Sequence, residues 1–272
     1  MATAAINGTE LFYEEVGQSG PVCLVMHGGL GFDHTYFRPE FDALARNHRV
    51  VYYDHRGNGR SGRPPLDTLT MEQLADDAAA LLGHLGATRA RVIGHSYGGF
   101  VAQEFALRHP DRLEALVLID TTPGQLGTGE VEDTRGKPPP PEFIELMSAP
   151  PANDADFTAM APKVMPFYFH RPDEVDIAGH TAHTIWSADA MMRSMMVLGG
   201  WSSVDRLAQV SVPTLMLCGR HDVVTSWPQG ERIASRIPGA ELYVFEESGH
   251  FPWLEEHDHF FAVLTGWLDG LG

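Results

Sequence analysis

Cysteine is scarce in this chain, which has only two among its 272 residues. Cys23 and Cys218 each lie inside a short apolar run of the kind that forms a buried strand. Such cysteines are typical of reduced thiols in a protein core, and two of them cannot build the disulfide framework of a small secreted domain. The pattern favours a cytoplasmic protein.

Basic residues are also few. The chain has 19 lysines and arginines against 36 aspartates and glutamates, a formal net charge of −17, so nucleic acid and anionic membranes are poor partners. No apolar run reaches the ~20 residues of a membrane span. Residues 1–10 lack the basic start and apolar core of a secretory signal. We therefore expect a cytoplasmic protein whose partner is a small-molecule substrate, with no nucleic acid and no membrane bound.

What the sequence does contain is an alternation of apolar strands and helices. Residues 3–16 alternate on both sides of Asn7-Gly8, which predicts a two-residue hairpin turn. Further strands are predicted at residues 22–26, 49–53, 91–93, 115–119, 214–218 and 242–245, and helices at residues 35–46, 70–85, 101–108, 229–236 and 255–268. Continuous apolar strands separated by helices are typical of a parallel sheet covered on both faces. The predicted fold is an α/β fold with a mostly parallel, eight-stranded sheet.

The alternation stops after Asp120 and resumes near residue 204. Residues 123–203 contain no strand-like run and carry two clusters of prolines. We interpret this segment as a helical cap, or lid, inserted over the carboxyl edge of the sheet. The predicted division is a core of residues 1–122 and 204–272 with a cap of residues 123–203.

A candidate nucleophile lies in the Gly94-His95-Ser96-Tyr97-Gly98 segment, between a predicted strand and a predicted helix. A nucleophile elbow requires this context, because the sharp turn lifts the serine hydroxyl clear of the sheet edge. Gly94 and Gly98 fit the same prediction, since strand and helix approach too closely there for a β-carbon. We interpret Ser96 as the nucleophile and His95 as a structural residue.

A base and an acid for Ser96 follow later strands, and ligands of open α/β sheets bind at the carboxyl ends of the strands. His250 lies between the final strand and the final helix, where an imidazole can accept the Ser96 proton. Asp222 follows the preceding strand and can accept the second imidazole N–H, which fixes the tautomer. Asp120, after the strand that follows the elbow helix, is the competing acid.

Two backbone amides are candidates for holding the oxyanion of a tetrahedral intermediate. One belongs to Tyr97, directly after the nucleophile, and the other to Gly29, in the glycine-rich turn after residues 22–26. Glycine lets that amide approach the reacting carbonyl closely. The remaining histidines and glycine-rich turns lack the pattern of a metal or phosphate site, so we expect no metal and no cofactor.

The cap contains two pairs of methionines, Met191-Met192 and Met195-Met196, one helical turn apart. They are interpreted either as packing between cap and core or as the lining of an adaptable acyl pocket, since methionine fills irregular apolar space. The candidate pocket residues are Leu30, Trp186, Met192, Met196 and Trp201.

Over almost its full length apart from the cap, the chain resembles the α/β-hydrolase fold superfamily. Four segments are similar to those of proline iminopeptidases and their near relatives: 27–31 (His-Gly-Gly-Leu-Gly), 54–61 (Asp-His-Arg-Gly-Asn-Gly-Arg-Ser), 94–99 (Gly-His-Ser-Tyr-Gly-Gly) and 245–256, which contains Ser-Gly-His-Phe-Pro-Trp. The chain order Ser96, Asp222, His250 is also that of the superfamily. The resemblance implies the fold, the cap insertion and the roles argued above for these three residues, Gly29 and Tyr97.

The chain departs from the iminopeptidase pattern near the substrate. Leu30 stands where the iminopeptidases have proline, and Tyr97 where they have tryptophan. Their cap carries glutamates that hold the α-amine of the substrate, one of them directly after a tryptophan. Trp186 and Trp201 are each followed by serine here, so these glutamates are not carried over.

We therefore expect a cofactor-free serine hydrolase that cleaves a small carboxylic ester, lactone or amide through an acyl-enzyme on Ser96. The alternatives are an iminopeptidase-like N-terminal aminopeptidase and a non-catalytic small-ligand receptor on the same fold. Haloalkane dehalogenase and epoxide hydrolase chemistry is not expected, since those relatives have aspartate at the position of Ser96.

Overall fold

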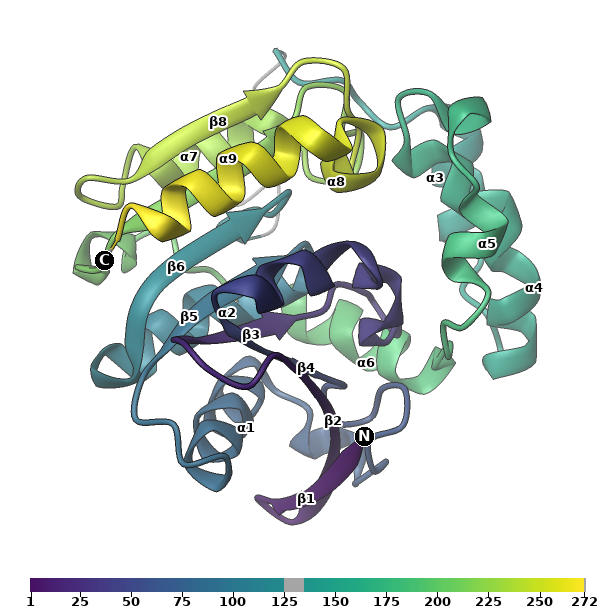
Figure 1. Cartoon of the computed structure of the whole chain (residues 1–272). Helices are drawn as coiled ribbons and strands as arrows, with labels where there is room; N and C mark the ends of the chain where they lie inside the picture. The colour runs from purple at the N-terminus through teal and green to yellow at the C-terminus, as the bar shows by residue number, and fades with distance from the viewer. Residues whose placement is uncertain (125–134, 272) are drawn as a thin grey trace.

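The computed structural model describes residues 1–124 and 135–271, and an eight-stranded sheet forms its centre (Figure 1). The strands are β1 (Ala2–Ile6), β2 (Thr9–Val16), β3 (Val22–Met26), β4 (Arg49–Tyr53), β5 (Ala90–His95), β6 (Leu113–Ile119), β7 (Thr214–Gly219) and β8 (Glu241–Phe245). Their order across the sheet is β1-β2-β4-β3-β5-β6-β7-β8. β2 pairs antiparallel with β1 and β4, and the other neighbours are parallel. The predicted fold class is confirmed.

The hairpin at the amino terminus has the predicted turn. Ile6 pairs with Thr9, so Asn7 and Gly8 are the two loop residues. Both have positive φ values, 44° and 80°, as a type I′ turn requires. Because all strands from β3 onward run in one direction, the segments after β3, β5, β7 and β8 emerge at one edge of the sheet.

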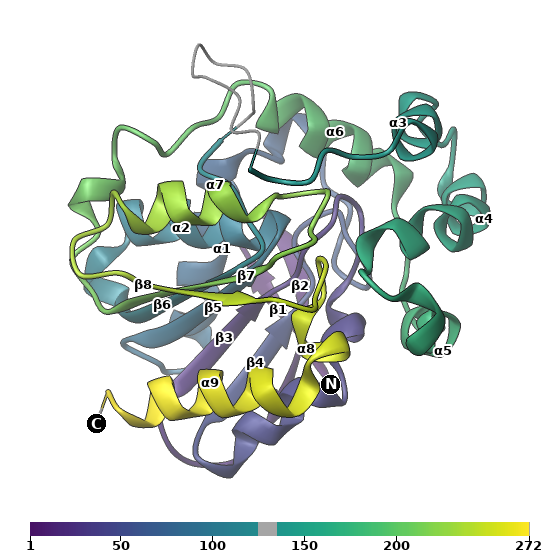
Figure 2. The same ribbon diagram turned by 90° about the horizontal axis from the view of Figure 1, so that it is seen from above.

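Helices cover both faces of the sheet (Figure 2). α1 (Met71–His84), α2 (Tyr97–Arg108) and α7 (Trp227–Ala234) lie on one face, and α9 (His257–Asp269), preceded by the short α8 (Pro252–Glu255), lies on the other. α1 begins after Thr70, which caps it by accepting a hydrogen bond from the Gln73 amide, and ends before Gly86 at φ 70°. No helix in the described part of the chain is long and apolar enough to cross a membrane.

Residues 35–46 are not one helix, contrary to the prediction. They form two 3₁₀ segments, His34–Phe37 and Glu40–Arg46. A proline disfavours the helical conformation in the residue before it, and Arg38, which precedes Pro39, is extended with φ −109° and ψ 144°. The apolar residues of both segments are still buried in the cluster around α9, so the interruption changes the backbone and leaves the packing face intact.

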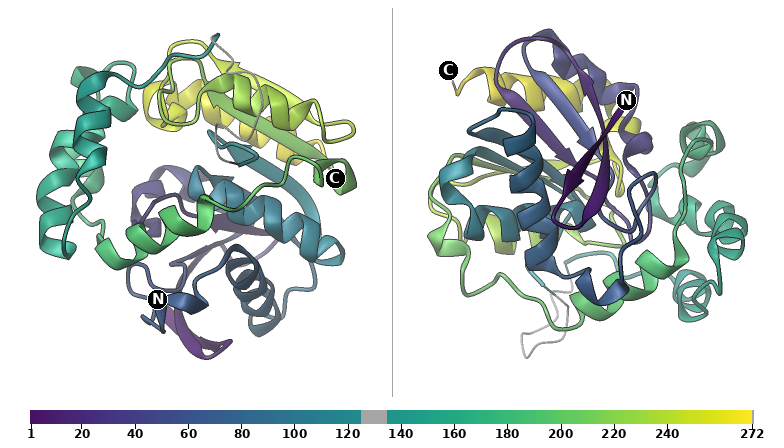
Figure 3. Two further views of the ribbon diagram at one scale, coloured as in Figure 1. Left: turned by 180° about the vertical axis from the view of Figure 1, so that it is seen from behind. Right: turned by 90° about the horizontal axis from the view of Figure 1, so that it is seen from below.

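The cap segment, residues 135–203 in the described part of the chain, is helical. It contains α3 (Pro141–Ser148), α4 (Asp154–Val164), α5 (Ile177–Thr181) and α6 (Ala188–Leu198). α3, α4 and α5 stand at the carboxyl ends of the strands, and α6 leads back to the core (Figures 1 and 3). The two ends of the segment lie side by side, since Gly124 forms an isolated bridge with Ser202. Of the predicted cap, residues 125–134 lie outside the described residues.

Gly98→Ala tests the close approach of α2 to the sheet. A β-carbon on Gly98 would overlap the carbonyl oxygen of Met26 at the end of β3, so the helix would have to move. We expect the free energy of unfolding to fall by about 1–3 kcal/mol, the usual cost of overpacking. The control is Gly266→Ala in α9, where the added methyl group meets open space and should stabilise by about 0.5–1 kcal/mol. Urea unfolding measures both, and a stabilised Gly98→Ala variant would contradict the packing argument.

Candidate active site

Ser96 occupies a strained turn between β5 and α2. Its backbone has φ 52° and ψ −115°, a positive-φ conformation that costs a residue with a β-carbon about 1–3 kcal/mol. Two backbone hydrogen bonds of 2.9 Å fix the turn: Ser96 N donates to Ile119 O of β6, and Gly99 N donates to Ser96 O. A β-carbon on Gly94 would overlap the carbonyl oxygen of Gly98. The strand–turn–helix context predicted for Ser96 is therefore present.

Asp222 and His250 form a buried, hydrogen-bonded pair. They lie in the segments after β7 and β8, and each is 1% exposed. His250 Nδ1 lies 2.7 Å from Asp222 Oδ2. A carboxylate can only accept, so Nδ1 carries the hydrogen and Nε2 is left to accept a proton. The structure thus brings the predicted acid and base together.

The surroundings of Asp222 favour its ionised form. Burial alone would raise the pKa of this carboxyl, but the His250 imidazole and the hydrogen bonds from Thr225 and Val224 hold it below its ordinary value. The donors are the amides of Val224 and Thr225, at 2.7 and 3.1 Å, the Thr225 hydroxyl, at 2.7 Å, and His250. A carboxylate held in this way can orient the imidazole and stabilise its protonated form.

The imidazole of His250 is held beside the Ser96 turn. The amide of His250 donates to the carbonyl of Tyr168 at 2.7 Å, and its ring centroid lies 4.6 Å from that of His95, the residue before Ser96. Among the described residues no hydrogen bond of 3.5 Å or less reaches the Ser96 hydroxyl, and catalytic hydrogen bonds are often longer before substrate binds. Proton transfer from Ser96 to His250 therefore stays a prediction.

His95 links the loop of the base to the glycine-rich turn after β3. Its Nε2 donates to the carbonyl of His250 at 3.0 Å, and its Nδ1 accepts from the hydroxyl of Tyr36 at 2.9 Å. The same hydroxyl accepts a hydrogen bond from the amide of Gly28. Burial lowers the pKa of His95 well below its ordinary value, so the ring is neutral and can accept at one nitrogen while donating at the other. These contacts agree with the structural interpretation of His95.

Gly29 and Tyr97 lie side by side at the Ser96 cavity. Tyr97 is the first residue of α2, and the first amides of a helix have no partner within it. A β-carbon placed on Gly29 would be 3.8 Å from the β-carbon of Tyr97, and both residues line the cavity that contains Ser96. This placement is compatible with an oxyanion hole, and the role of the two amides stays a prediction.

Ser96 opens into an apolar cavity of about 320 Å³ between the core and the cap segment. That volume is near the lower end of the ~300–1,000 Å³ usual for small-molecule sites. The core contributes Leu30 and Phe100 to its walls, and the cap segment contributes Phe143, Met160 and Trp186. No aspartate, glutamate, lysine, arginine or histidine is found among the described residues that line it. The cavity therefore suits an uncharged, apolar group.

Two of the predicted pocket residues, Leu30 and Trp186, line this cavity, whereas Met192 and Met196 do not. Met192 and Met196 are 39% and 69% exposed, so their prediction as pocket residues is wrong. The face of α6 turned toward the cavity carries Met191. Each step along a helix rotates the side chain by about 100°, so Met192 points away from the cavity.

The prediction of Trp201 as a pocket residue is also wrong, because Trp201 is buried behind the cavity wall. Its ring packs edge-on against Phe100, with 5.4 Å between centroids. Its indole N–H donates to Glu104 at 2.8 Å, and the same carboxylate pairs with Arg206. Trp201 therefore supports a lining residue and does not line the cavity itself.

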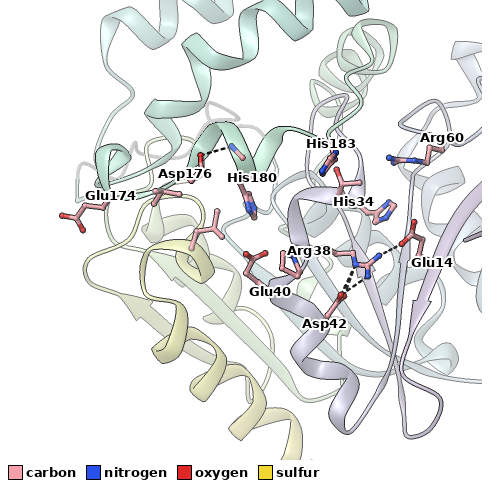
Figure 4. A pocket seen from close by; sticks show the side chains of 15 residues that line it. Glu14, His34, Arg38, Glu40, Asp42, Arg60, Glu174, Asp176, His180 and His183 are labelled. Atoms are coloured by element: carbon pink, nitrogen blue, oxygen red, sulfur yellow. Dashed lines mark hydrogen bonds and ion pairs between the residues drawn. The ribbon is translucent and has the colours of Figure 1, made fainter.

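A second, larger cavity of about 730 Å³ lies between α5 and the 3₁₀ segments that follow β3 (Figure 4). It is polar: Arg38 pairs with Asp42 at 2.9 Å and with Glu14. Ser96 does not line it. The smaller cavity, which Ser96 does line, is therefore the candidate site for acyl transfer.

Asp120, the competing acid, lies close to the pair formed by Asp222 and His250. One ligand atom from each of the three side chains lies within 4.8 Å of the others, a spacing that could hold a metal ion. Asp120 accepts a hydrogen bond from the amide of Gly219 at 2.8 Å, and among the described residues it makes none to His250. The hydrogen bond between His250 and Asp222 fits a proton-transfer pair, so the chemistry of the group does not call for a metal.

Glu255, which the sequence analysis did not single out, joins the cap segment to the loop that carries His250. Its Oε1 accepts from the amides of His170 and Arg171 at 2.7 and 2.8 Å, and its Oε2 accepts from the amide of Gly249 at 2.6 Å. Burial raises its pKa above the ordinary value. The one feature of the sequence that points to Glu255 is its position within residues 245–256, a segment that resembles those of the iminopeptidases.

Comparison with protein families places most of the chain in one of them. Residues 21–257 match the family model described as alpha/beta hydrolase fold. RutD of Serratia proteamaculans (strain 568), named as a carbamate hydrolase, is 28% identical to this chain over 95% of its length and 96% of the relative's. RutD of Pseudomonas savastanoi pv. phaseolicola is 30% identical, with 84% of this chain and 86% of the relative covered.

Solved structures of hydrolases are similar over nearly the whole chain. The enol-lactonase from Burkholderia xenovorans LB400 has a TM-score of 0.80 at 26% identity and covers 98% of this chain and 100% of its own. A thermophilic esterase from Thermogutta terrifontis has a TM-score of 0.74 at 29% identity, with 99% and 97% covered. Est816, described as an N-acyl homoserine lactone degrading enzyme, has a TM-score of 0.77 at 26% identity, with 97% and 99% covered.

Glu255→Gln tests the link between the cap segment and the His250 loop. The substitution replaces one acceptor oxygen by an NH₂ group, so a backbone N–H such as that of Gly249 loses its partner. An unsatisfied buried N–H costs about 1–3 kcal/mol, and we expect a loss of that size in the free energy of unfolding together with a lower kcat. Glu246→Gln is the control, because Glu246 is 63% exposed and, among the described residues, forms its ion pair with Arg220 at the surface. Equal stability of the two variants would contradict the proposed link.

Proposed function

Because the chain belongs to the α/β hydrolase fold family and is a hydrolase of that fold, we propose that it is a serine hydrolase for neutral carboxylic esters or lactones with an apolar acyl group. The observation that carries this proposal is the apolar cavity onto which Ser96 opens, with no charged side chain among its described lining residues. The substrate is a small molecule, and nucleic acid and membrane surfaces are not partners of this acidic chain.

The proposed reaction has two halves that use the same groups. Ser96 Oγ attacks the substrate carbonyl carbon while its proton passes to His250 Nε2, and Asp222 stabilises the imidazolium through Nδ1. The amides of Gly29 and Tyr97 hold the oxyanion, and the loss of one such donor typically costs ~10²–10³ in turnover. His250 then protonates the leaving alcohol as its bond to the acyl carbon breaks. In the second half His250 takes a proton from water, which attacks the acyl carbon. The bond to Ser96 Oγ then breaks, the imidazolium of His250 returns its proton to Ser96 Oγ, and the acid is released.

We also propose that residues 123–203 act as a cap that closes the acyl end of the cavity. The cap segment contributes much of the lining, and Ser187 attaches it to the core. The amide of Ser187 donates to the carbonyl of Gly31 at 2.8 Å, and its hydroxyl donates to the carbonyl of Gly57 at 3.0 Å. These bonds place α6 directly over the glycine-rich turn that contains Gly29.

The uncharged lining separates this proposal from its alternatives. An N-terminal aminopeptidase must hold the ammonium group of its substrate, and burying an ammonium without a carboxylate is costly. Carbamate hydrolysis, the activity in the names of the RutD relatives, involves a small polar acid for which a lining of aromatic and aliphatic side chains offers few partners. A ligand receptor would have the same cavity without turnover, so kinetics separate it from an enzyme.

Ser96→Ala tests the proposed nucleophile. We expect kcat on short-chain nitrophenyl esters or acyl lactones to fall by more than about 10³, since the acyl-enzyme cannot form. No described residue donates a hydrogen bond to the lost hydroxyl or accepts one from it, so the unfolding midpoint in urea should stay within error of the unsubstituted protein. A folded variant that keeps more than about a thousandth of the activity would show that another group is the nucleophile.

A matched pair of methionines tests the acyl site. Met191→Ala removes apolar contact with the acyl group and should lower kcat/KM for nitrophenyl hexanoate relative to the acetate by about 3–10-fold, since each buried methylene group contributes about 0.8 kcal/mol. Met196→Ala removes a side chain that is 69% exposed and should leave the ratio unchanged. Prolyl-arylamide should not be a substrate of any variant. The reverse result, with Met196 and not Met191 altering the ratio, would place the acyl group outside the described cavity.

A further inference from the structure

Asp120 is buried in a way that the proposed mechanism does not use. It directly follows β6, has 0% exposure, and has a positive φ of 41°, which is uncommon for a residue with a β-carbon. Its Oδ1 accepts from the amide of Gly219, whereas its Oδ2 is buried and has no hydrogen-bond partner among the described residues. A buried carboxylate oxygen without a donor is costly, so this oxygen calls for an explanation.

The neighbour of Asp120 is a second carboxyl group, that of Asp222. Side-chain oxygens of the two lie within 4.8 Å of each other and of a His250 nitrogen. Two carboxylates this close in a buried site cannot both be ionised without a large repulsive cost. One proton must therefore be shared or held by one member of the pair.

The hydrogen bonds decide which carboxyl group holds that proton. Asp222 receives hydrogen bonds from the amides of Val224 and Thr225, the Thr225 hydroxyl and His250. Within the described part of the chain, Asp120 receives one, from Gly219. Hydrogen bonds from donors stabilise the ionised form, so the charge belongs on Asp222 and the proton on the bare Oδ2 of Asp120.

We propose that Asp120 is a neutral carboxylic acid whose Oδ2–H group donates to the Asp222 carboxylate and holds it in position against His250. Asp120 is then a positioning residue, which acts on the reaction through Asp222. The positioning role rests on the proposed function, whereas the protonated state of Asp120 can be measured without it.

The charged groups around Asp120 agree with this state. Burial raises the pKa of Asp120 well above its ordinary value, and the charges of Asp222 and Glu255 raise it further. The Gly219 amide acts in the opposite direction, and the neighbouring Cys218 thiol is neutral because burial raises its pKa. The imidazole of His250 faces Asp222, with Nδ1 at 2.7 Å from Asp222 Oδ2.

Two variants of similar size distinguish the loss of the hydrogen-bond donor from the loss of the carboxyl group. Asp120→Asn keeps a donor, since the amide NH₂ group can replace the acid O–H, whereas Asp120→Leu has none. We expect Asp120→Asn to retain kcat within about threefold and Asp120→Leu to lose about tenfold or more. In Asp120→Leu the acid limb of the pH profile of kcat/KM should move to higher pH, because an Asp222 that accepts one hydrogen bond fewer is more basic and stabilises the His250 imidazolium more strongly.

Two measurements without substrate test the protonated state directly. Infrared difference spectra at pH 8, wild type minus Asp120→Asn, should show the C=O band of a protonated carboxylic acid. The second measurement is the free energy of unfolding in urea, determined at several pH values. A raised pKa in the folded state means that the folded protein keeps a proton that the unfolded chain loses above about pH 4. The contribution of Asp120 to wild-type stability then falls with rising pH, so the free energy of unfolding of Asp120→Asn should increase relative to that of wild type as pH rises.

The outcomes are distinct. No protonated band at pH 8, or a stability difference that does not change with pH, would overturn the inference. An Asp120→Asn variant as inactive as Asp222→Asn would make Asp120 the ionised acid of the site. If the band and the pH trend are found but Asp120→Leu keeps full activity and an unshifted pH profile, the positioning role is overturned. If wild type turns over none of the esters or lactones, the proposed function fails while the protonation result stands.

Discussion

The close approach of the amino terminus of α2 to the end of β3 is the constraint on which the rest of the site depends. Gly98 lies so near the carbonyl groups of Met26 and His27 that no β-carbon fits between them. The chain passes from β5 into the helix here through the positive-φ turn at Ser96, at a cost of about 1–3 kcal/mol. Packing of α2 on the sheet offsets that strain. Tyr97, the first residue of this helix, lies next to Gly29, so the nucleophile and the proposed oxyanion site depend on the same packing of α2.

Three carboxyl groups of this acidic protein, those of Asp120, Asp222 and Glu255, lie near the segments around His250. Each accepts at least one hydrogen bond from a backbone amide, and the second oxygen of Asp120 has no donor among the described residues. The cavity at Ser96 has no charged residue among its described lining. The hydrogen bonds around His250 fix the position of the base. The uncharged lining of the cavity favours a neutral substrate, because a charged group would find no partner there. Binding and proton transfer are therefore carried by separate sets of side chains.

The sequence predicts those parts of the structure that local chemistry determines. Apolar runs predicted the strands, Asn7-Gly8 predicted the hairpin, and the elbow segment predicted the turn at Ser96, because each depends on the residues of one short stretch. The rotation of α6 does not follow from its own composition, since Met191 and Met192 are chemically identical and only contacts with the core decide which of them faces the cavity. The proton on Asp120 and the bridge made by Glu255 depend on distances between remote segments, which no local pattern contains.

The central claim is that Ser96 is an activated nucleophile in an apolar cavity, and covalent labelling tests it most directly. A neutral alkyl fluorophosphonate mimics the tetrahedral intermediate and needs an activated hydroxyl to react. Intact-mass measurement followed by peptide mapping should find one adduct per chain, on Ser96, formed faster with a hexyl than with a methyl phosphonate. An adduct on any other residue, or no adduct on the folded protein, would contradict the account.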